Sequence, residues 1–384
     1  MSGLVLSLNA GSSNLKAALF EVLEGEPSEV GRTKIDRGDS AETTVAAALA
    51  WADRTAAGRA LIGAGHRIVH GGPDFHSPLR LTPEIVRELE ALIPLAPLHQ
   101  PEGLAAVRAL TAARPDLDQV ACFDTAFHWS QPAVAQWIGL PRSLHDKGVR
   151  RYGFHGLSYE HITRRLAVLD PELAGGRVVV AHLGSGASLC AIRAGASVET
   201  TMGFSPLDGL LMSTRPGRLD PGVVLYLLQH EGMTAGEIEN LLYHRSGLLG
   251  VSGISDDMRT LLSSDLAAAG EAVDLFVHRA ALEASALATA MSGLDGFVFT
   301  GGIGENSAEI RARIAGRLSW LGLELDGAAN ADSGERRIDD PGGRLRAWVI
   351  PTDEEASIAR HVLDVLAALS TARRGRAAWR RMQA

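Results

Sequence analysis

Two stretches of the chain, about half its length apart, repeat one pattern. The first reads 6-LSLNAGSSNLKAALF-20 and the second reads 179-VVAHLGSGASLCAIR-193. In each, an apolar segment runs into a Gly-Ser turn, and a second apolar segment follows at the same offset, which is typical of a β-hairpin. Two such hairpins favour a duplicated architecture.

The rest of the sequence alternates between short runs rich in Val, Ile and Leu and longer runs rich in Ala, Leu, Arg and Glu. The short runs predict strands and the long runs predict helices, so the fold class is α/β. We expect strands at 4–8, 15–22, 66–70, 119–123, 177–183, 188–192, 296–300 and 346–350. We expect helices at 83–92, 102–113, 158–169, 221–230, 234–243, 270–292, 307–318 and 354–369.

Composition narrows the class of protein. The chain has 384 residues, of which 46% are hydrophobic, so it can bury a large core or two. Its net charge of −8 argues against a nucleic-acid binder, because such binding depends on Lys and Arg neutralising phosphates. The exception is the tail 371-TARRGRAAWRRMQA-384, which we interpret as a solvated helix end, with a membrane or nucleic-acid contact as the alternative.

Nothing in the sequence predicts export or membrane insertion. The two cysteines, Cys122 and Cys190, have no metal-ligand spacing and suit a reducing, cytoplasmic setting. There is no secretory signal pattern, and no uncharged run reaches the ~18 residues that span a bilayer.

The first Gly-Ser turn is a candidate phosphate loop of an unusual kind. It is not a Walker A loop, which needs G-x-x-x-x-G-K-[ST] before a helix, nor a Rossmann turn. As a hairpin turn, Gly11 would let the backbone approach an anion, Ser12 could donate a hydrogen bond, and Lys16 adds a positive charge. Asn9 could face a metal-bound water. An ordinary hairpin is the alternative.

Two further glycine turns have the same character. The second hairpin turn, 182-HLGSGAS-188, could hold one end of a polyphosphate. The third, 299-FTGGIGENSAEIRARI-314, follows a strand and opens a helix, with Asn306 as the expected N-cap and Glu309 completing a capping box. A helix start and glycine backbone suit the ribose, base or α-phosphate of a nucleotide. A simple strand-to-helix turn is the alternative.

Together these motifs carry a family resemblance. The chain resembles the acetate kinase family, within the superfamily of acetate and sugar kinases, heat-shock chaperones and actin. The matching stretches are 9-NAGSSNLK-16, 66-HRIVHGG-72, 123-FDTAFH-128, 152-YGFHGLSYEHI-162, 181-AHLGSGAS-188, 201-TMGFSPLDGLLMSTRPGRLDPG-222, 256-DDMR-259, 300-TGGIGEN-306 and 351-PTDEEASIAR-360.

The resemblance implies two duplicated actin/ribonuclease-H-like domains with the active site in the cleft between them. We expect residues 1–148 and a returning C-terminal helix, ~357–384, to form the first domain, and residues 149–356 to form the nucleotide-binding domain. The implied reaction is reversible transfer of the ATP γ-phosphoryl group to acetate, giving acetyl phosphate and ADP, with Mg²⁺ or Mn²⁺. The resemblance also implies a homodimer with small-molecule substrates, and no nucleic-acid or membrane partner.

Carried over residue by residue, the resemblance implies a set of roles. Arg67 would bind the acyl carboxylate, Arg215 and His155 the transferred phosphoryl group, and Asp124 would orient an arginine or a magnesium-bound water. The implied acyl pocket is Val69, Leu98, Phe154 and Pro206. Asn9 and Glu354, the first of an acidic pair with Glu355, would hold the metal. The implied nucleotide-binding residues are Ser12, Lys16, His182, Leu183, Gly184, Ser185, Gly186, Asp257, Met258, Arg259, Gly302, Ile303, Gly304, Glu305 and Asn306.

The chain departs from the family pattern at several positions, and alternatives remain open. Ser185 stands where the family usually has asparagine, which points to altered nucleotide affinity or a changed phosphoryl donor. Gln100 and Asp353 also replace asparagines of the family motifs. Propionate is a possible acceptor, since one methylene is worth only ~1–3 kcal/mol in an apolar pocket. The alternatives are a propionate or butyrate kinase, a pyrophosphate-dependent enzyme, or an actin-like nucleotide switch without an acceptor.

Overall fold

The computed structural model describes residues 3–11, 14–23 and 25–382, without the side chains of residues 372–382. These residues pack into two units. Unit 1 contains the described parts of Met1–Phe127, Gly156–His161 and Asp353–Ala384, and unit 2 contains His128–His155 and Ile162–Thr352. The domain boundaries expected from the sequence stay a prediction.

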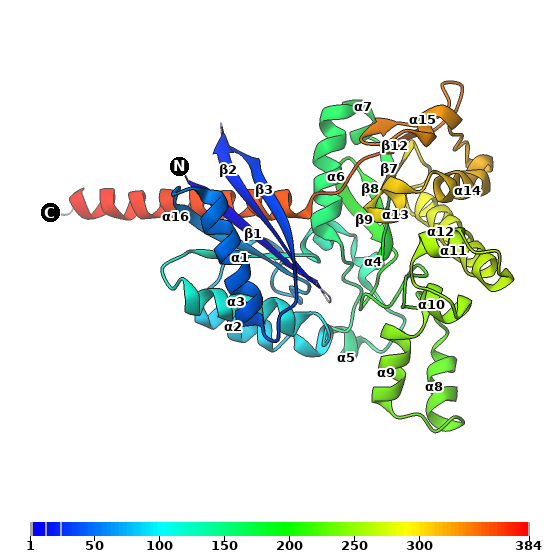
Figure 1. The fold of residues 1–384 in the computed structure, drawn as a ribbon, viewed down its shortest axis with the longest axis horizontal. Helices are drawn as coiled ribbons and strands as arrows, with labels where there is room; N and C mark the ends of the chain where they lie inside the picture. Colours follow the sequence, from blue (N-terminus) through cyan, green and yellow to red (C-terminus); the bar gives the residue numbers. More distant parts are fainter. Residues whose placement is uncertain (1–2, 12–13, 24, 383–384) are drawn as a thin grey trace. The chain divides into compact units, whose positions relative to one another are not determined.

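Unit 1 is built on a mixed six-stranded sheet in the order β3-β2-β1-β4-β6-β5 (Figure 1). Its strands are β1 (Leu4–Ala10), β2 (Asn14–Leu23), β3 (Glu26–Asp36), β4 (Leu61–Ile68), β5 (Leu79–Arg80) and β6 (Gln119–Phe123). The predicted hairpin is the antiparallel pair β1–β2, whereas β4 runs parallel to both β1 and β6. The carboxyl ends of β1, β4 and β6 therefore share one edge of the sheet.

Helices cover both faces of this sheet. They are α1 (Ala41–Ala56), α2 (Pro83–Glu90), α3 (Gln100–Ala113) and α16 (Glu354–Met382), with the start of α6 (Gly156–Leu169) and the 3-10 turns η1 (Ile93–Leu95) and η2 (Ala126–Ser130), the latter running on into unit 2. Leu4, Leu6 and Leu8 of β1 pack with α1 and α3. Val5 packs on the opposite face with α16, as the period of two in a strand requires.

Glycines in β4 let α16 approach its face of the sheet closely. A Cβ at Gly65 would lie 2.3 Å from Ile358 Cγ2 and 2.7 Å from Val362 Cγ2. Any side chain there would push the helix away from the strand. Glycines also weaken the strand pattern in the first half of β4. The sequence therefore predicted a strand over 66–70, whereas the structure has Leu61–Ile68.

Unit 2 repeats the sheet of unit 1. Its order is β11-β12-β10-β7-β8-β9, with strands β7 (Arg177–Leu183), β8 (Ala187–Arg193), β9 (Ala196–Thr200), β10 (Gly296–Thr300), β11 (Arg336–Arg337) and β12 (Arg346–Val349). The pair β7–β8 is antiparallel, and β7, β10 and β12 run parallel, like β1, β4 and β6. The predicted α/β class and duplicated architecture are confirmed.

The helices of unit 2 precede β7, lie in the long insertion between β9 and β10, or follow β10. They are α4 (Ala133–Gln136), α5 (Arg142–His145), the rest of α6, α7 (Pro171–Ala174), α8 (Pro221–Gln229), α9 (Ala235–His244), α10 (Gly247–Ser252), α11 (Met258–Leu262), α12 (Ala267–Ala290), α13 (Gly301–Asn306), α14 (Ala308–Leu318), η3 (Ser319–Leu321) and α15 (Gly327–Ala331).

Helix α16 runs well beyond the predicted range of 354–369, to Met382. The side chains of the arginine-rich tail lie outside the described residues, so its predicted role stays a prediction. In the part of the chain that the structure describes, no helix combines the length and apolar content needed to cross a membrane.

Two buried histidines make the fold sensitive to acid. His66 Nε2 donates to Gln119 Oε1 at 2.7 Å, and burial lowers the pKa of His66 from 6.5 to about 4. Burial also lowers the pKa of His128 to about 4. Between pH 6.5 and 4 the unfolded chain binds a proton at each of these histidines that the folded chain does not bind. Their contribution to stability is therefore fully present above pH 6.5 and falls as the pH drops towards 4.

We predict that His66→Gln flattens this pH dependence, because glutamine can meet Gln119 without titrating. The unfolding free energy of wild type should fall by up to about 1.4 kcal/mol per pH unit for each such histidine. In the variant, the contribution of one histidine to this slope should be missing. Urea titrations between pH 7 and 4.5 measure it, with the exposed His230→Gln as control. Parallel curves for wild type and His66→Gln would contradict the assignment.

Candidate active site

Four predicted site residues of unit 1 share one face of its sheet. Val5, Ala18 and Cys122 pack against α16, so residues an even number of positions away in the same strands face the same side. Those residues are Asn9, Lys16 and, just past β6, Asp124; Gly65 likewise places Arg67 on that side. Asn9 and Lys16 are direct cross-strand partners. The helix that starts above this edge begins with Glu354 and Glu355.

Arg67 and Asp124 form a buried ion pair at the ends of β4 and β6. Arg67 Nε lies 2.9 Å from Asp124 Oδ2 and 3.1 Å from Oδ1, and Nη2 also donates to Oδ2. Asp124 is fully buried, and burial raises its pKa against the opposing effect of Arg67. Burial favours loss of the Arg67 charge, but Asp124 and the two glutamates raise its pKa overall. Both groups therefore hold each other in place.

Asn9 holds the acidic pair together. Its Nδ2 donates to Glu354 Oε2 at 2.8 Å and to Glu355 Oε1 at 2.9 Å. Burial and the neighbouring Glu354 charge raise the pKa of Glu355, and Lys16 opposes this shift. Two carboxylates thus converge on one amide, which makes this cluster a candidate site for a cation.

This cluster suits Mg²⁺ better than a metal ion whose ligands all come from protein side chains. Within the described residues, no group of three His, Cys, Asp or Glu side chains forms a ready metal site. Mg²⁺ usually keeps several waters and binds one or two carboxylates together with substrate phosphates. The chemistry of Glu354 and Glu355 fits that pattern, and Asn9 would orient them.

In unit 2, His155 occupies a strained backbone position. Its φ of +60° is in the left-handed region, which a residue with a side chain seldom adopts. His155 Nδ1 lies 2.8 Å from Ser188 Oγ, and its ring stacks on His182 with centroids 4.4 Å apart. Ser188 is the cross-strand partner of His182, so one hairpin positions both histidines.

The second Gly-Ser turn brings Arg215 beside His155. A Cβ at Gly186 would lie 2.8 Å from Arg215 Nη2 and 3.2 Å from His155 Nε2. Arg215 Nη1 donates to the Pro206 carbonyl at 2.7 Å. Ser185 is exposed at the tip of the turn, and its carbonyl accepts from Ser213 N. His182, Leu183, Gly184, Ser185 and Gly186 therefore lie at one end of β7.

The third glycine turn is a short helix, α13, and not a loop. Gly301 has φ +77°, and a Cβ there would lie 2.8 Å from the Leu183 carbonyl. Gly302 is exposed with nothing within 4 Å of its Cβ position, so a ligand could approach its backbone. Of the other predicted nucleotide contacts, Gly304 is buried in α13, whereas Ile303 is half-buried.

The capping box expected from Asn306 and Glu309 is wrong, because Glu309 lies only two residues after the true N-cap. Asn306 is not the N-cap of the following helix: Ser307 is, because its hydroxyl accepts the Ile310 N–H of α14. Asn306 instead ends α13 and donates to the Gly302 carbonyl at 2.9 Å. Glu305 Oε1 is occupied by the backbone N–H groups of Gly301 and Thr352, at 2.8 and 3.0 Å.

The segment 256–259 is tied to the Arg215 loop. Ser213 Oγ donates to the Asp256 carbonyl at 2.8 Å. Asp257 caps α11 and pairs with Arg259, whose side chain is 90% exposed, while Met258 is buried. Asp257 and Arg259 are thus on the surface near this loop, and only Met258 belongs to the core.

The predicted acyl-pocket residues divide between the units. Val69 and Leu98 belong to unit 1, and Phe154 and Pro206 belong to unit 2. Val69, Phe154 and Pro206 are buried and Leu98 is half-buried. Ser12 lies outside the described residues. The predicted cleft and the shared pocket stay predictions.

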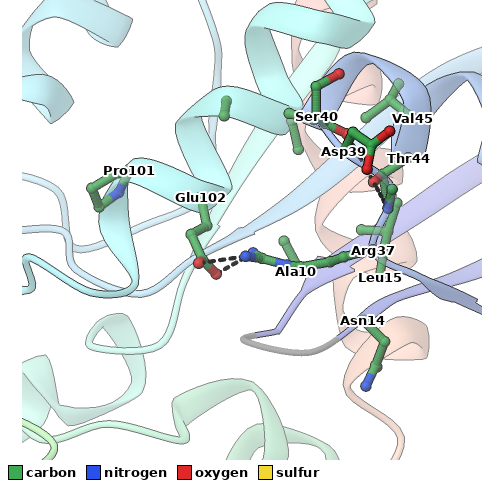
Figure 2. A pocket seen from close by; sticks show the side chains of 14 residues that line it. Ala10, Asn14, Leu15, Arg37, Asp39, Ser40, Thr44, Val45, Pro101 and Glu102 are labelled. Carbon is green, nitrogen blue, oxygen red and sulfur yellow. Dashed lines mark hydrogen bonds and ion pairs between the residues drawn. The ribbon is translucent and has the colours of Figure 1, made fainter. Parts of the chain in front are cut away.

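A cavity of unit 1 lies beside the first hairpin (Figure 2). It has a volume of about 340 Å³ and is lined by Ala10, Asn14, Leu15, Arg37, Gly38, Asp39, Ser40, Ala41, Thr44, Val45, Pro101, Glu102, Ala105 and Ala106. Arg37 Nη1 donates to Glu102 Oε1 at 2.6 Å along one wall, as Figure 2 shows. None of the predicted reactive groups lines this cavity.

Sequence reasoning missed residues that act through others. Ser188 was only a strand residue, although its alignment opposite His182 was a usable signal. Gln100, one of the departures from the family pattern, is buried and bonds the backbone N–H and carbonyl of His70. Asp353 accepts the Ala356 N–H at the start of α16. Both departures therefore have structural roles of their own.

Known proteins resemble this chain over nearly its whole length. The pattern that defines the acetokinase family matches residues 22–360. The acetate kinase of Rhodopseudomonas palustris (strain ATCC BAA-98 / CGA009) is 51% identical over 94% of this chain and 98% of its own length. The acetate kinase of Methylocella silvestris is 47% identical over 97% of this chain and all of its own length.

Two solved structures also match this chain over nearly its whole length. Porphyromonas gingivalis acetate kinase superposes with a TM-score of 0.83 at 32% identity, over 95% of this chain and 100% of that one. A propionate kinase from Francisella tularensis gives 0.86 at 32% identity, with the same coverage. The predicted family resemblance and actin-like fold are confirmed. The chain belongs to the acetokinase family.

Proposed function

We propose that this protein transfers the γ-phosphoryl group of ATP to acetate, reversibly, to give acetyl phosphate and ADP. The observation that carries the proposal is the Arg67–Asp124 pair in a chain of this family. Asp124 accepts hydrogen bonds from Nε and Nη2 of Arg67. The third nitrogen of Arg67, Nη1, has no hydrogen-bond partner among the described residues. That nitrogen is the part of the fork that a substrate carboxylate would meet.

The main obstacle to this reaction is charge. A carboxylate acceptor is already ionised at neutral pH and needs no general base. It must instead approach a polyphosphate, so positive groups have to offset the repulsion and align the reactants. Asp124 fits a positioning role, because both its oxygens are bonded to Arg67.

Unit 2 would supply the groups for the phosphoryl side. Ser188 holds His155 Nδ1, which leaves Nε2 directed towards Gly186, where Arg215 Nη2 also lies. A guanidinium and an imidazole N–H beside one glycine can donate to the equatorial oxygens of the group in transfer. Lys16 in unit 1 adds a charge for the β- or γ-phosphate.

We further propose Mg²⁺ as the required ion, with Mn²⁺ as a substitute. When bound, it would offset charge on the β- and γ-phosphates. Glu354 and Glu355 would hold it through water, and Asn9 would keep the two carboxylates in place.

Propionate is the second candidate acceptor. A structural relative of equal coverage is a propionate kinase, and one methylene changes binding in an apolar pocket by only ~1–3 kcal/mol. Ser185 keeps pyrophosphate open as a donor, because its short exposed side chain offers no amide to a nucleotide.

We also propose that the enzyme is a homodimer in the cytoplasm. Helix α8 supports this proposal, because none of its residues is buried. Its hydrophobic side chains Val223, Leu225, Tyr226 and Leu228 are all at least 41% exposed. A helix that is apolar all round is expected to be covered. A second copy of the chain is the simplest occupant. The free, buried thiols of Cys122 and Cys190 suit a reducing compartment.

The first prediction of this proposal concerns the reaction itself. Hydroxylamine trapping should detect acyl phosphate with acetate, ATP and Mg²⁺, and less or none when EDTA replaces Mg²⁺. Parallel arms use propionate, butyrate and pyrophosphate. Phosphate release without acyl phosphate in every arm would reject the proposal in favour of a nucleotide switch.

We predict that Arg67→Ala lowers kcat by about 100-fold or more and raises KM for acetate, because the acceptor loses its cation. Arg215→Ala should lower kcat similarly while the Kd for ADP changes little. Arg80→Ala, which removes the exposed Arg80–Asp118 pair of the same sheet, is the control. Near-normal kcat in either active-site variant would refute its assigned role.

A methyl group at Gly302 should test the nucleotide contact without disturbing the free protein. Nothing lies within 4 Å of that Cβ position, so Gly302→Ala should keep the wild-type unfolding midpoint. If a nucleotide packs on this backbone, the Kd for ADP rises by about tenfold. Calorimetric titration measures it, with Gly270→Ala, equally open, as control. Unchanged ADP affinity would remove Gly302 from the site.

The dimer proposal predicts that charge on α8 yields monomers. Leu225→Glu with Tyr226→Glu should halve the mass measured by light scattering after size exclusion. Carboxylates buried in the subunit interface would lack an opposite charge, which makes the dimer unfavourable. Val168→Glu, at a more exposed apolar position on α6, is the control. A wild-type monomer, or a variant that stays dimeric, would rule out this surface.

A further inference from the structure

The reactive side chains of unit 2 come from two loops. The loop before α6 carries Phe154 and His155, and the loop after β9 carries Pro206 and Arg215. Neither loop is held by a strand ladder or a helix along these residues. Their mutual geometry must therefore depend on specific contacts between the loops.

Arg151 supplies such a contact from the first loop. Its Nη1 donates to Asp208 Oδ2 at 3.1 Å, and its Nη2 donates to the Thr200 carbonyl at 2.7 Å. Glu199 Oε1 lies 3.7 Å from Nη2. A single guanidinium thus binds the end of β9 and the middle of the second loop at once.

The backbone supports the same junction. The N–H groups of Tyr152 and Gly153 both point at the Gly203 carbonyl, at 3.0 and 3.3 Å. A Cβ at Gly203 would lie 2.6 Å from Asp208 Oδ2 and 2.8 Å from Arg151 Nη1, so the ion pair packs directly on this glycine. The second Asp208 oxygen accepts the Gly209 N–H at 2.9 Å, which fixes the carboxylate.

Further contacts connect the bridge to the reactive groups. Arg151 lies shortly before His155 in the sequence, and Asp208 follows Pro206, whose carbonyl accepts from Arg215 Nη1. A shift of the Asp208 loop would therefore move the carbonyl that orients Arg215. Misplacement by about 1 Å can lower turnover by about 100-fold.

We propose that Arg151 is a positioning residue for phosphoryl transfer: its bridge to Asp208 and Thr200 sets the distance between the His155 loop and the Arg215 loop. It touches no substrate and acts through the two loops that it joins. This inference rests on the proposed function for its kinetic readout. It predicts an effect on kcat with little effect on nucleotide affinity, because the bridge contacts neither the Gly184–Gly186 turn nor α13.

A double-mutant cycle tests the bridge. Arg151→Ala and Asp208→Asn should each lower kcat by about tenfold or more, and the double variant should be no worse than Arg151→Ala by more than about twofold. The Kd for ADP should stay within about twofold of wild type in all three. Arg165→Ala, which breaks the paired Arg165–Glu335 contact elsewhere in unit 2, should leave kcat unchanged. Losses that multiply, or a normal kcat, would overturn the proposal.

Chemical rescue separates positioning from general stability. Arg151, Glu199, Thr200, Asp208 and Arg218 line one open cavity of about 360 Å³, so guanidinium ion can reach the space that Arg151→Ala leaves. Millimolar guanidinium chloride should raise kcat of Arg151→Ala at least about fivefold, and sodium chloride at equal concentration should not. Absence of rescue, with a lowered unfolding midpoint, would show a merely structural role.

Hydrogen exchange gives a readout that needs no activity. In Arg151→Ala and in Asp208→Asn, amides of residues 152–155 and of residues 203–215 should both exchange faster, although each variant changes only one loop. Exchange confined to the mutated loop would overturn the proposal. If wild type makes no acyl phosphate, the proposed function fails, whereas this measurement still decides whether the bridge exists.

Discussion

A guanidinium held by a carboxylate at the ends of two parallel strands determines what unit 1 can do. Strands β4 and β6 are neighbours in register, so Arg67 and Asp124 leave the sheet side by side, and the Asp124 N–H bonds the Ile68 carbonyl at 3.1 Å. Neither charge could be buried there alone, since an unpaired buried ion is costly. The ion pair is therefore a structural contact that also fixes the Arg67 guanidinium at the edge of the sheet.

The two sheets place different chemistry at equivalent positions. Asn9 and His182 occupy the same place in the two aligned hairpins, just before the turn. In unit 1 the amide of Asn9 binds two carboxylates, which favours a cation. In unit 2 the ring of His182 stacks on His155, beside the glycine turn. One duplicated topology thus places an amide that binds carboxylates at this position in one copy and an imidazole ring in the other.

Local sequence patterns predicted the buried elements of the fold well and the exposed ones poorly. Strands β6, β7 and β10 match their predicted ranges because each is a short apolar run buried on both faces. Strand β3 was missed because it is an exposed edge whose side chains are mostly charged or small. Helix α1 was missed although Ser40 and Thr43 form a capping box at its start, because half of its buried residues are alanines, which give a weak apolar pattern.

The sequence allowed the candidate site to be named as a list of residues but not to be described as a set of contacts. Arg67 stood out as a charge in an apolar strand, and period-two alternation could have placed Asn9 and Lys16 on its side of the sheet. Its pairing with Asp124 depends on strand order, which no local pattern gives. The roles of Ser188, Gln100 and Glu305 depend in the same way on contacts between residues far apart in the sequence or fixed only on folding.

The two units solve the problem of rigidity differently. Asn9, Lys16 and Arg67 lie in strands, and Asp124 directly follows one, so ladder hydrogen bonds fix their backbone before any side-chain contact forms. His155, Pro206 and Arg215 lie in loops, and His155 adopts a positive φ that costs about 1–3 kcal/mol. A strained loop residue keeps its conformation only where neighbours over-determine it, here through Ser188, His182 and the Arg151 bridge that joins its loop to that of Arg215. Catalytic geometry in unit 2 should therefore depend more on residues that never meet the substrate than it does in unit 1.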